Sequence, residues 1–308
     1  MQNFDELRRE AEETKERLRR DILELRDIFS RIAREGGDRG RTLAEESLKQ
    51  AETRIEEAIS QAEKRFETAL AAVTGCNLDY DDFVTRELDI RDFANIEADC
   101  AFRVEIVQSG DFRVGIWASE ALQKEVNAVK SGNTLKLSLK SHSFHARPIV
   151  EAKVSLPQLN RLRLGGAASA TARGIESKGD LDLNLSGNSV LDIEAGAVAL
   201  KCEISGASKV MGRVQVTNAE FVLSGASRLA LTGSTGDMTL SGWGASRAET
   251  EGFKAENARL FLKGASEATI KAGGQLDIDL SGGSRLTYSG NPTIHSISVT
   301  GASSLNHT

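Results

Sequence analysis

Apolar and polar residues alternate with a period of two through most of the second half of the chain. Residues 181–185 read Leu-Asp-Leu-Asn-Leu, and residues 276–280 read Leu-Asp-Ile-Asp-Leu. Because successive side chains of a β-strand point to opposite faces, this pattern predicts strands with one apolar and one polar face. A second alternating segment follows each of these after a short Gly-small-Ser sequence, as at residues 190–193 and 228–231.

This two-strand unit is repeated eight times. The form apolar-x-Gly-small-Ser recurs with glycine spacings of 21, 19, 19, 19, 20, 18 and 19 residues. Units of this size cannot bury their apolar faces singly but can when stacked, so we predict a mainly β fold, a parallel β-helix of about 19 residues per repeat over residues 161–308. The predicted corner glycines are Gly166, Gly187, Gly206, Gly225, Gly244, Gly264, Gly282 and Gly301.

A second turn is expected between each repeat and the next. It is marked by a glycine or a small polar cluster at Gly196, Gly212, Gly233, Gly252, Gly273 and Gly290.

Residues 1–75 have a helical period instead. Between Met1 and Val73 there are 15 basic and 18 acidic residues, and apolar residues from Phe4 to Ile32 recur at alternating steps of three and four. A second stripe runs from Leu48 to Val73 after the break at residues 36–40. Helices of about 3–35 and 41–73 are predicted, each with an apolar stripe too narrow to be buried without a partner. We expect a coiled-coil oligomerisation segment, either an antiparallel hairpin or a continuous parallel coiled coil.

Residues 77–160 are less regular but rich in strand patterns. We expect them to form the opening coils and cap of the same column, giving a β-helix domain over residues 76–308, because an open solenoid end exposes unpaired strand edges. Ser119 is a suitable N-cap for a short helix through Asn127.

Composition narrows the possible functions. Twenty-one of the 28 glycines lie between Gly165 and Thr308, which places the glycine excess in the repeats, and the net charge of −6 argues against a surface built to hold nucleic acid. No apolar run is long enough for a transmembrane helix. The N-terminus lacks the apolar stretch of a secretory signal, which favours a cytoplasmic location, and the odd, widely spaced cysteines imply neither a disulfide framework nor a zinc site.

Several phrases resemble one known bacterial family. They are the segment at 93–126, which begins FANIEADCAFRVEIV, the phrase VEAKVSLPQLNRLRLGG from residue 150, the SGAS repeats and the ending LSGGSRLTYSGNPTIHSISVTGAS. They resemble the putative auto-transporter adhesin, head GIN domain, a domain of unknown function, over about residues 85–308. The resemblance implies a right-handed parallel β-helix that is usually exported or associated with the cell envelope. It implies no catalytic residues, and the coiled-coil segment departs from the family's usual signal or lipobox.

Two classes of solenoid enzyme require groups of residues that this sequence does not bring together. Hexapeptide acyltransferases require a catalytic histidine at a coil edge, but His142, His145, His295 and His307 lie outside the regular repeats or at their end. Polysaccharide lyases gather acidic calcium ligands on one face, whereas Asp182, Asp192, Asp277 and Asp279 do not share one repeat phase in consecutive coils. We therefore predict no enzymatic activity, no catalytic residues, no metal and no cofactor.

Two ladders of side chains are candidates for ligand binding. The position after the repeat serine carries Lys209, Arg228, Arg247 and Arg285, interrupted by Glu267, and such a column could bind an acidic glycan or form an ordinary solvated edge. The column of repeat serines, Ser189 through Ser303, could form a flat binding face or simply a turn of small residues.

The sequence as a whole favours a non-enzymatic structural or adhesive protein. In this interpretation residues 1–75 form a homo-oligomer that carries a rigid β-helix head or rod, and the partners are further copies of the chain and a surface glycan or protein. Two alternatives are a glycan-binding or degenerate polysaccharide-active β-helix, and a cytoplasmic scaffold that polymerises by end-to-end stacking of β-helices.

Overall fold

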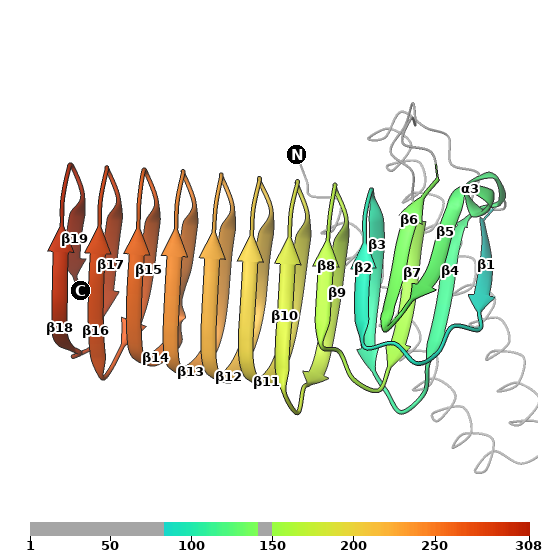
Figure 1. Ribbon diagram of the computed structural model, residues 1–308, viewed down its shortest axis with the longest axis horizontal. Helices are drawn as coiled ribbons and strands as arrows, with labels where there is room; N and C mark the ends of the chain where they lie inside the picture. Colours follow the sequence, from blue (N-terminus) through green and yellow to red (C-terminus); the bar gives the residue numbers. More distant parts are fainter. Residues whose placement is uncertain (1–82, 141–149) are drawn as a thin grey trace, which may run out of the picture. The chain divides into compact units, whose positions relative to one another are not determined.

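The computed structural model describes residues 83–140 and 150–308, all within one compact unit from Tyr80 to Thr308. The predicted helices and coiled coil of residues 1–75 lie outside the described residues, as do His142 and His145. The described chain is a β-solenoid in which each coil stacks on the next by parallel strand pairing (Figure 1).

The repeat region confirms the predicted solenoid with its repeat of about 19 residues. Leu191, Val210, Leu229 and Ala248 occupy equivalent positions on consecutive coils and pair in register. The strands are β8 (Arg161–Leu164), β9 (Ser169–Glu176), β10 (Asp180–Leu185), β11 (Val190–Ile204), β12 (Lys209–Leu223), β13 (Arg228–Gly242), β14 (Arg247–Leu262), β15 (Glu267–Ala272), β16 (Gln275–Leu280), β17 (Arg285–Ser289), β18 (Thr293–Val299) and β19 (Ser304–His307).

The corner glycines form one stacked column. All eight have positive φ, between 62° and 80°, a conformation that glycine adopts without steric cost. The amides of Ala207 and Ala226 donate to the carbonyls of Gly187 and Gly206 at 2.8 Å, so the hydrogen-bond ladder continues through the turn. A side chain on one corner glycine would meet the carbonyl of the glycine below it.

The prediction of a second turn between strands is wrong for the central coils. β11, β12 and β13 each run 15 residues, and β14 runs 16, without interruption through the expected turn. The chain bends within the strand at Gly212 (φ 140°) and Gly233 (φ 121°), where the backbone lies against the preceding coil. Neighbouring coils bend at nearly the same level, so strand pairing resumes beyond the bend, with register shifts between Ala230 and Gly233 on β13 and between Thr250 and Lys254 on β14. The two strands are separated at residues 177–179 in the first coil of the repeats and again, further along, at Gly273 and Gly290.

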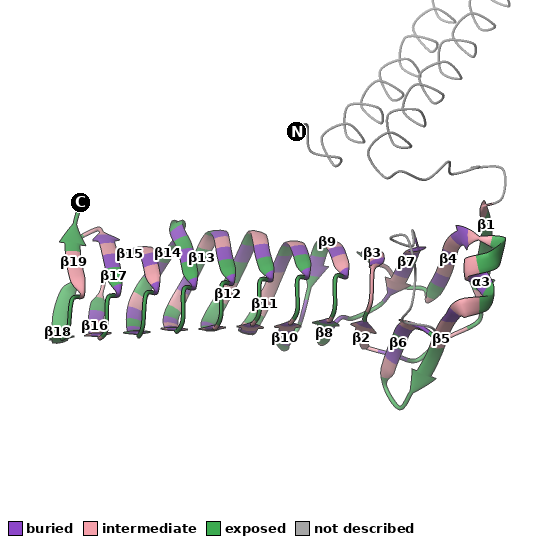
Figure 2. Cartoon of the chain, turned by 90° about the horizontal axis from the view of Figure 1, so that it is seen from above, coloured by how far each residue is buried: buried purple, intermediate pink, exposed green. Residues whose placement is uncertain are grey.

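The interior is filled by the inward side chains of both halves of every coil. Leu, Ile and Val ladders run along the column, and Phe221 meets Phe253 edge to face with 5.8 Å between ring centroids. Figure 2 shows buried and exposed positions alternating along the strands. The repeat serines are part of this interior: Ser189, Ser208 and Ser227 are 0% exposed. The serine column is therefore not an external binding face.

Coils at the N-terminal end do not stack in chain order. β2 pairs in parallel with both β6 and β8, and β3 pairs with both β7 and β9, so the first coil lies between two later ones (Figure 1). The strand patterns of residues 77–160 give no indication of this interleaved order. The elements are β1 (Phe83–Leu88), β2 (Asn95–Ala98), β3 (Phe102–Gln108), β4 (Arg113–Ser119), α3 (Glu120–Glu125), β5 (Val126–Ser131), β6 (Thr134–Leu139) and β7 (Val150–Leu156).

Antiparallel strands close this end. β4 pairs with β7, β1 pairs with β4, and β5 pairs with β6, all antiparallel. The helix α3 has the predicted N-cap, with Ser119 Oγ accepting from Leu122 N at 3.4 Å, but it ends at Glu125 because β5 begins at the next residue. The Gln123 side chain donates to the carbonyls of Val84 (2.8 Å) and Ile116 (3.0 Å), which fastens the helix to β1 and β4.

Candidate functional site

One column of outward side chains alternates in charge along the solenoid. Register places Arg161 beside Asp182, Asp182 beside Lys201, and Lys201 beside Glu220. After Thr239 the alternation resumes with Arg259 and Asp277. Because neighbouring rungs are about 4.8 Å apart, each charge lies next to one of opposite sign, and the column compensates itself.

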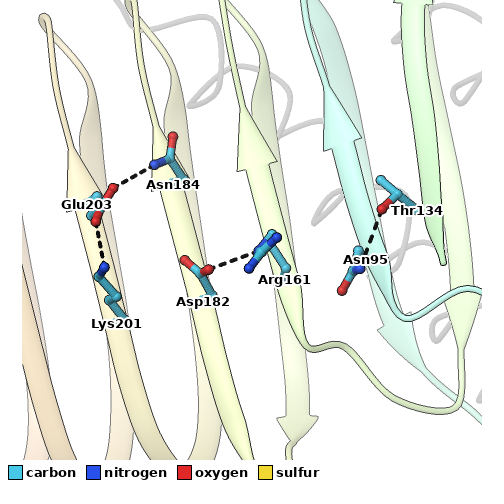
Figure 3. A network of polar contacts seen from close by, with 7 residues as sticks. All are labelled: Asn95, Thr134, Arg161, Asp182, Asn184, Lys201 and Glu203. Atoms are coloured by element: carbon cyan, nitrogen blue, oxygen red, sulfur yellow. Dashed lines mark hydrogen bonds and ion pairs between the residues drawn. The ribbon is translucent and has the colours of Figure 1, made fainter. Parts of the chain in front are cut away.

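The side chains at the N-terminal end of this face are held by a polar network (Figure 3). Arg161 Nε lies 2.9 Å from Asp182 Oδ2, and Lys201 Nζ lies 2.8 Å from Glu203 Oε1. The other carboxylate oxygen of Glu203 accepts from Asn184 Nδ2 at 3.0 Å. The hydrogen bond and charge of Glu203 raise the pKa of Lys201 above its ordinary value, so this ammonium stays charged. Exposed pairs of this kind add little stability, but they fix where polar groups point.

A shallow groove of about 890 Å³ follows this column across six strands. Two basic and four acidic side chains line it together with four amide side chains, so it carries an excess of negative charge and a dense supply of donors and acceptors. The lining residues are Asn95, Gln158, Asn160, Arg161, Gly179, Asp180, Leu181, Asp182, Ala199, Leu200, Lys201, Asn218, Ala219, Glu220, Asp237 and Thr239.

Exposed apolar side chains lie on the same face beyond the groove. Trp243 is 46% exposed and Phe261 is 37% exposed. Phe261 pairs opposite Ser241, two residues before Trp243, so the two rings come from adjacent coils. Trp243 follows Thr239 of the groove by four residues, roughly 13 Å along the chain. A polar groove with a nearby aromatic surface is a common arrangement in binding sites.

The predicted basic ladder lies on the other strand layer. Register aligns Lys209, Arg228, Arg247, Glu267 and Arg285 in one column. The carboxylate of Glu267 lies 2.6 Å from Arg247 and 4.0 Å from Arg285, so it neutralises part of the column. Lys209 and Arg228 are the two basic members of this column that form no ion pair within the described residues.

The groove was missed at the sequence level, although a signal for it exists. Arg161, Asp182, Lys201 and Glu220 are separated by 21, 19 and 19 residues and alternate in sign, which is visible in the printed sequence. Four aspartates of the repeats, Asp182, Asp192, Asp277 and Asp279, do not form a calcium site. Asp182 and Asp277 share the alternating column but are separated by intervening coils, and Asp192 lies on the other layer, 2.6 Å from Arg173.

Groups of reactive side chains are scarce in the part of the chain that the structure describes. Within residues 83–140 and 150–308, no three His, Cys, Asp or Glu side chains are grouped so that they could hold a metal ion. Cys202 is 0% exposed, and burial raises the pKa of its thiol far above the ordinary value. His307 stacks on Tyr288 with 4.7 Å between ring centroids, and its Nε2 lies 2.9 Å from the carbonyl of Gly290. No helix among these residues is long and apolar enough to cross a membrane.

The stacked coils define the protein as a β-solenoid, and known proteins with sequence or structural similarity support this class. The family described as putative auto-transporter adhesin, head GIN domain, matches residues 92–292. The chain belongs to this family, which confirms the resemblance noted in the sequence. A search of curated proteins found no match.

Solved structures share the fold at low sequence identity. A crystal structure of a putative lipid binding protein from Parabacteroides distasonis is 20% identical, with a TM-score of 0.67, over 74% of this chain and 97% of that one. A putative adhesin from the same organism is 15% identical, with a TM-score of 0.68, over 73% and 97%. A putative adhesin from Parabacteroides merdae is 18% identical, with a TM-score of 0.67, over 74% and 96%.

Proposed function

We propose that this protein is a non-enzymatic adhesive head that binds an extended, uncharged glycan along the groove of its alternating-charge face. The observation that carries the proposal is the groove itself, in which donors and acceptors repeat at every coil over six strands. A linear polymer of hydroxyl-bearing rings would meet the same kind of polar group at each step. The adhesin description of the family supports the same class of function.

The excess of negative charge in the groove favours a neutral polymer over an acidic one. Asp180, Asp182, Glu220 and Asp237 outnumber Arg161 and Lys201, so a polyanion would be repelled. Sugar hydroxyls both donate and accept hydrogen bonds, and the carboxylate and amide groups of the lining offer complements to both. This favours a neutral glycan over an acidic glycan or a nucleic acid.

The aromatic surface supplies the apolar part of recognition. A sugar ring has an apolar face that can pack on an indole, and Trp243 is exposed beside Phe261 for such a contact. A glycan lying along the groove, with one ring reaching Trp243, would combine hydrogen bonding with apolar burial.

Binding of the full chain to an array of neutral and acidic glycans tests the proposal. We expect binding to neutral glycans, weakened about 10-fold by Trp243→Ala and similarly by a double Asn218→Ala, Glu220→Ala variant. The matched control is a double Lys209→Ala, Arg228→Ala variant, which removes the two ladder residues that form no ion pair among the described residues and should leave binding unchanged. Binding of acidic glycans alone, lost in the control variant, would overturn the proposal in favour of the basic ladder.

We further propose that residues 1–75 join several heads. The heptad pattern of the sequence supports this role, and linking weak sites would raise avidity without new contacts. Deletion of residues 1–75 should lower the mass in solution and weaken binding to a glycan-coated surface. An unchanged oligomer size would refute the role of this segment and leave the groove proposal standing.

A further inference from the structure

The last coil differs in charge from all those before it. From Leu286 through Thr308 the sequence has no Lys, Arg, Asp or Glu, although such residues make up 27% of the chain. The preceding strand on the same layer, β16, carries Asp277 and Asp279 at its outward positions. The uncharged segment contains both strands of the final coil, β18 and β19.

Apolar side chains that belong to the interior are exposed on this coil. Ile294, Ile297 and Val299 are 42%, 53% and 42% exposed. They continue the ladders of Leu276, Ile278 and Leu280, whose side chains on the preceding coil are at most 2% exposed. Their exposure therefore arises because no further coil of the described chain covers them, and Figure 2 shows β18 as an exposed strand.

The final coil also has open backbone. Within the described residues, β18 pairs only with β16 and β19 only with β17. Natural sheets protect such edges with charged residues, prolines inside the strand or covering segments. The other end of the solenoid is protected in this way. Its edge strand β1 carries Arg86 and Glu87, β5 carries Lys130, and α3 packs on β1 and β4.

We propose that two copies of this protein pack their final coils against each other around a two-fold axis, with β18 of one protomer facing β18 of its partner. A two-fold interface uses the same patch of both copies, so residue i contacts residue j and j contacts i, and a charge near the axis would meet its own like charge. An edge without charged residues is the one that can pair with itself. The exposed Ile and Val side chains of the two copies would then cover one another.

The differing ends of the solenoid determine the form of the assembly. Head-to-tail stacking would require the charged, antiparallel end to fit the uncharged, parallel one, and repetition would give a filament. Joining two final coils gives a closed pair instead. The proposal therefore differs from end-to-end polymerisation and does not depend on glycan binding.

The test is the mass of the full chain in solution, measured by sedimentation over a range of concentrations. Ile297→Lys places a charge where the two copies meet, and we expect it to raise the dissociation constant of the tail-to-tail pair by about 100-fold or more. Where the chains paired through their final coils are not also joined to each other through residues 1–75, the mass should fall by half or more. Val198→Lys is the matched control, because Val198 is 49% exposed on β11, away from the end, and it should keep the wild-type mass.

Three results would overturn the proposal: a monomeric wild-type chain, an unchanged mass for Ile297→Lys, or an equal loss of mass for Val198→Lys. Far-ultraviolet circular dichroism of both variants keeps a folding defect from being mistaken for dissociation. A second variant, Val299→Glu, should reproduce the effect of Ile297→Lys if the fold of the latter is disturbed.

Discussion

Replacing one corner glycine by alanine measures how tightly the coils stack. Gly225 has φ 74°, and a Cβ there would lie 2.6 Å from the carbonyl oxygen of Gly206. That oxygen accepts the Ala226 amide at 2.8 Å, so it cannot move away without weakening the ladder. Gly174 is the matched control, because its φ is also positive (64°) but nothing lies within 4 Å of a Cβ there.

The two substitutions separate backbone strain from crowding. An alanine in the left-handed conformation costs roughly 1–2 kcal/mol at either position. Crowding against a backbone that cannot relax adds about 1–3 kcal/mol, and only at Gly225. We therefore expect Gly174→Ala to lower the free energy of unfolding by about 1–2 kcal/mol and Gly225→Ala by about 2–5 kcal/mol.

Denaturant unfolding followed by circular dichroism and tryptophan fluorescence measures this difference. Trp243 lies in the coil next to Gly225, while Trp117 lies in β4 at the capped end. Because coils of a solenoid can unfold separately, the fluorescence change nearest the substitution should move to lower denaturant first. Equal losses at Gly225 and Gly174 would show that the corner yields to a methyl group and would refute the argument from stacking.

Three further changes follow from individual side chains. The buried Ser227 Oγ has no hydrogen-bond partner among the described residues, so Ser227→Ala should not lower thermal stability. Ser284→Ala removes the 2.8 Å hydrogen bond from Ser284 Oγ to the Ser281 carbonyl and should lower the free energy of unfolding by about 1 kcal/mol. Because burial raises the pKa of the Cys202 thiol, above pH 9.0 this thiol ionises only in the unfolded state, and the free energy of unfolding falls as the pH rises. Cys202→Ala should remove this contribution to the pH dependence of unfolding. The hydrogen bond from the Ser296 hydroxyl, and to a lesser extent the one from Arg259, lowers the pKa of Asp277. The Asp277 carboxylate therefore stabilises the folded state above pH 3.8, and this stabilisation is lost as the pH falls below that value. Hydrogen exchange of β18 should accelerate on acidification, and less so in Asp277→Asn.

The periodic part of the fold could be predicted from the sequence because its cause is local. Alternation and the 19-residue spacing are both printed in the chain, and the corner glycines are required by a positive φ at every coil. At Gly212 and Gly233 the sequence predicts a turn, whereas the structure has a bend within a continuous strand. Sequence shows where the backbone changes direction, but pairing between neighbouring coils decides whether the strand is interrupted.

The order of the first coils and the position of the groove depend on distant segments. Asn95 pairs with both Thr134 and Arg161 on the neighbouring strands. The two sequence separations differ from each other and from the 19-residue repeat, so periodicity in the sequence does not predict these pairs. The alternating charges of the groove could have been found by aligning the repeats at positions other than the serine. The basic ladder was found by such an alignment, but its neutralisation by Glu267 depends on side-chain geometry.

The interleaved coils at the N-terminal end have a consequence for the order of folding. Most contacts in the repeats join residues about 19 apart, as in the Arg173–Asp192 bond, whereas Gln108 bonds to Glu176 across 68 residues and Asn95 to Thr134 across 39. Closing longer loops costs more entropy and slows the formation of the contacts that need them. The coil of β2 and β3 cannot be enclosed until β8 and β9 have emerged from the ribosome. The segment synthesised first among the described residues is therefore among the last to be completed, and short loops allow the later repeats to assemble one after another.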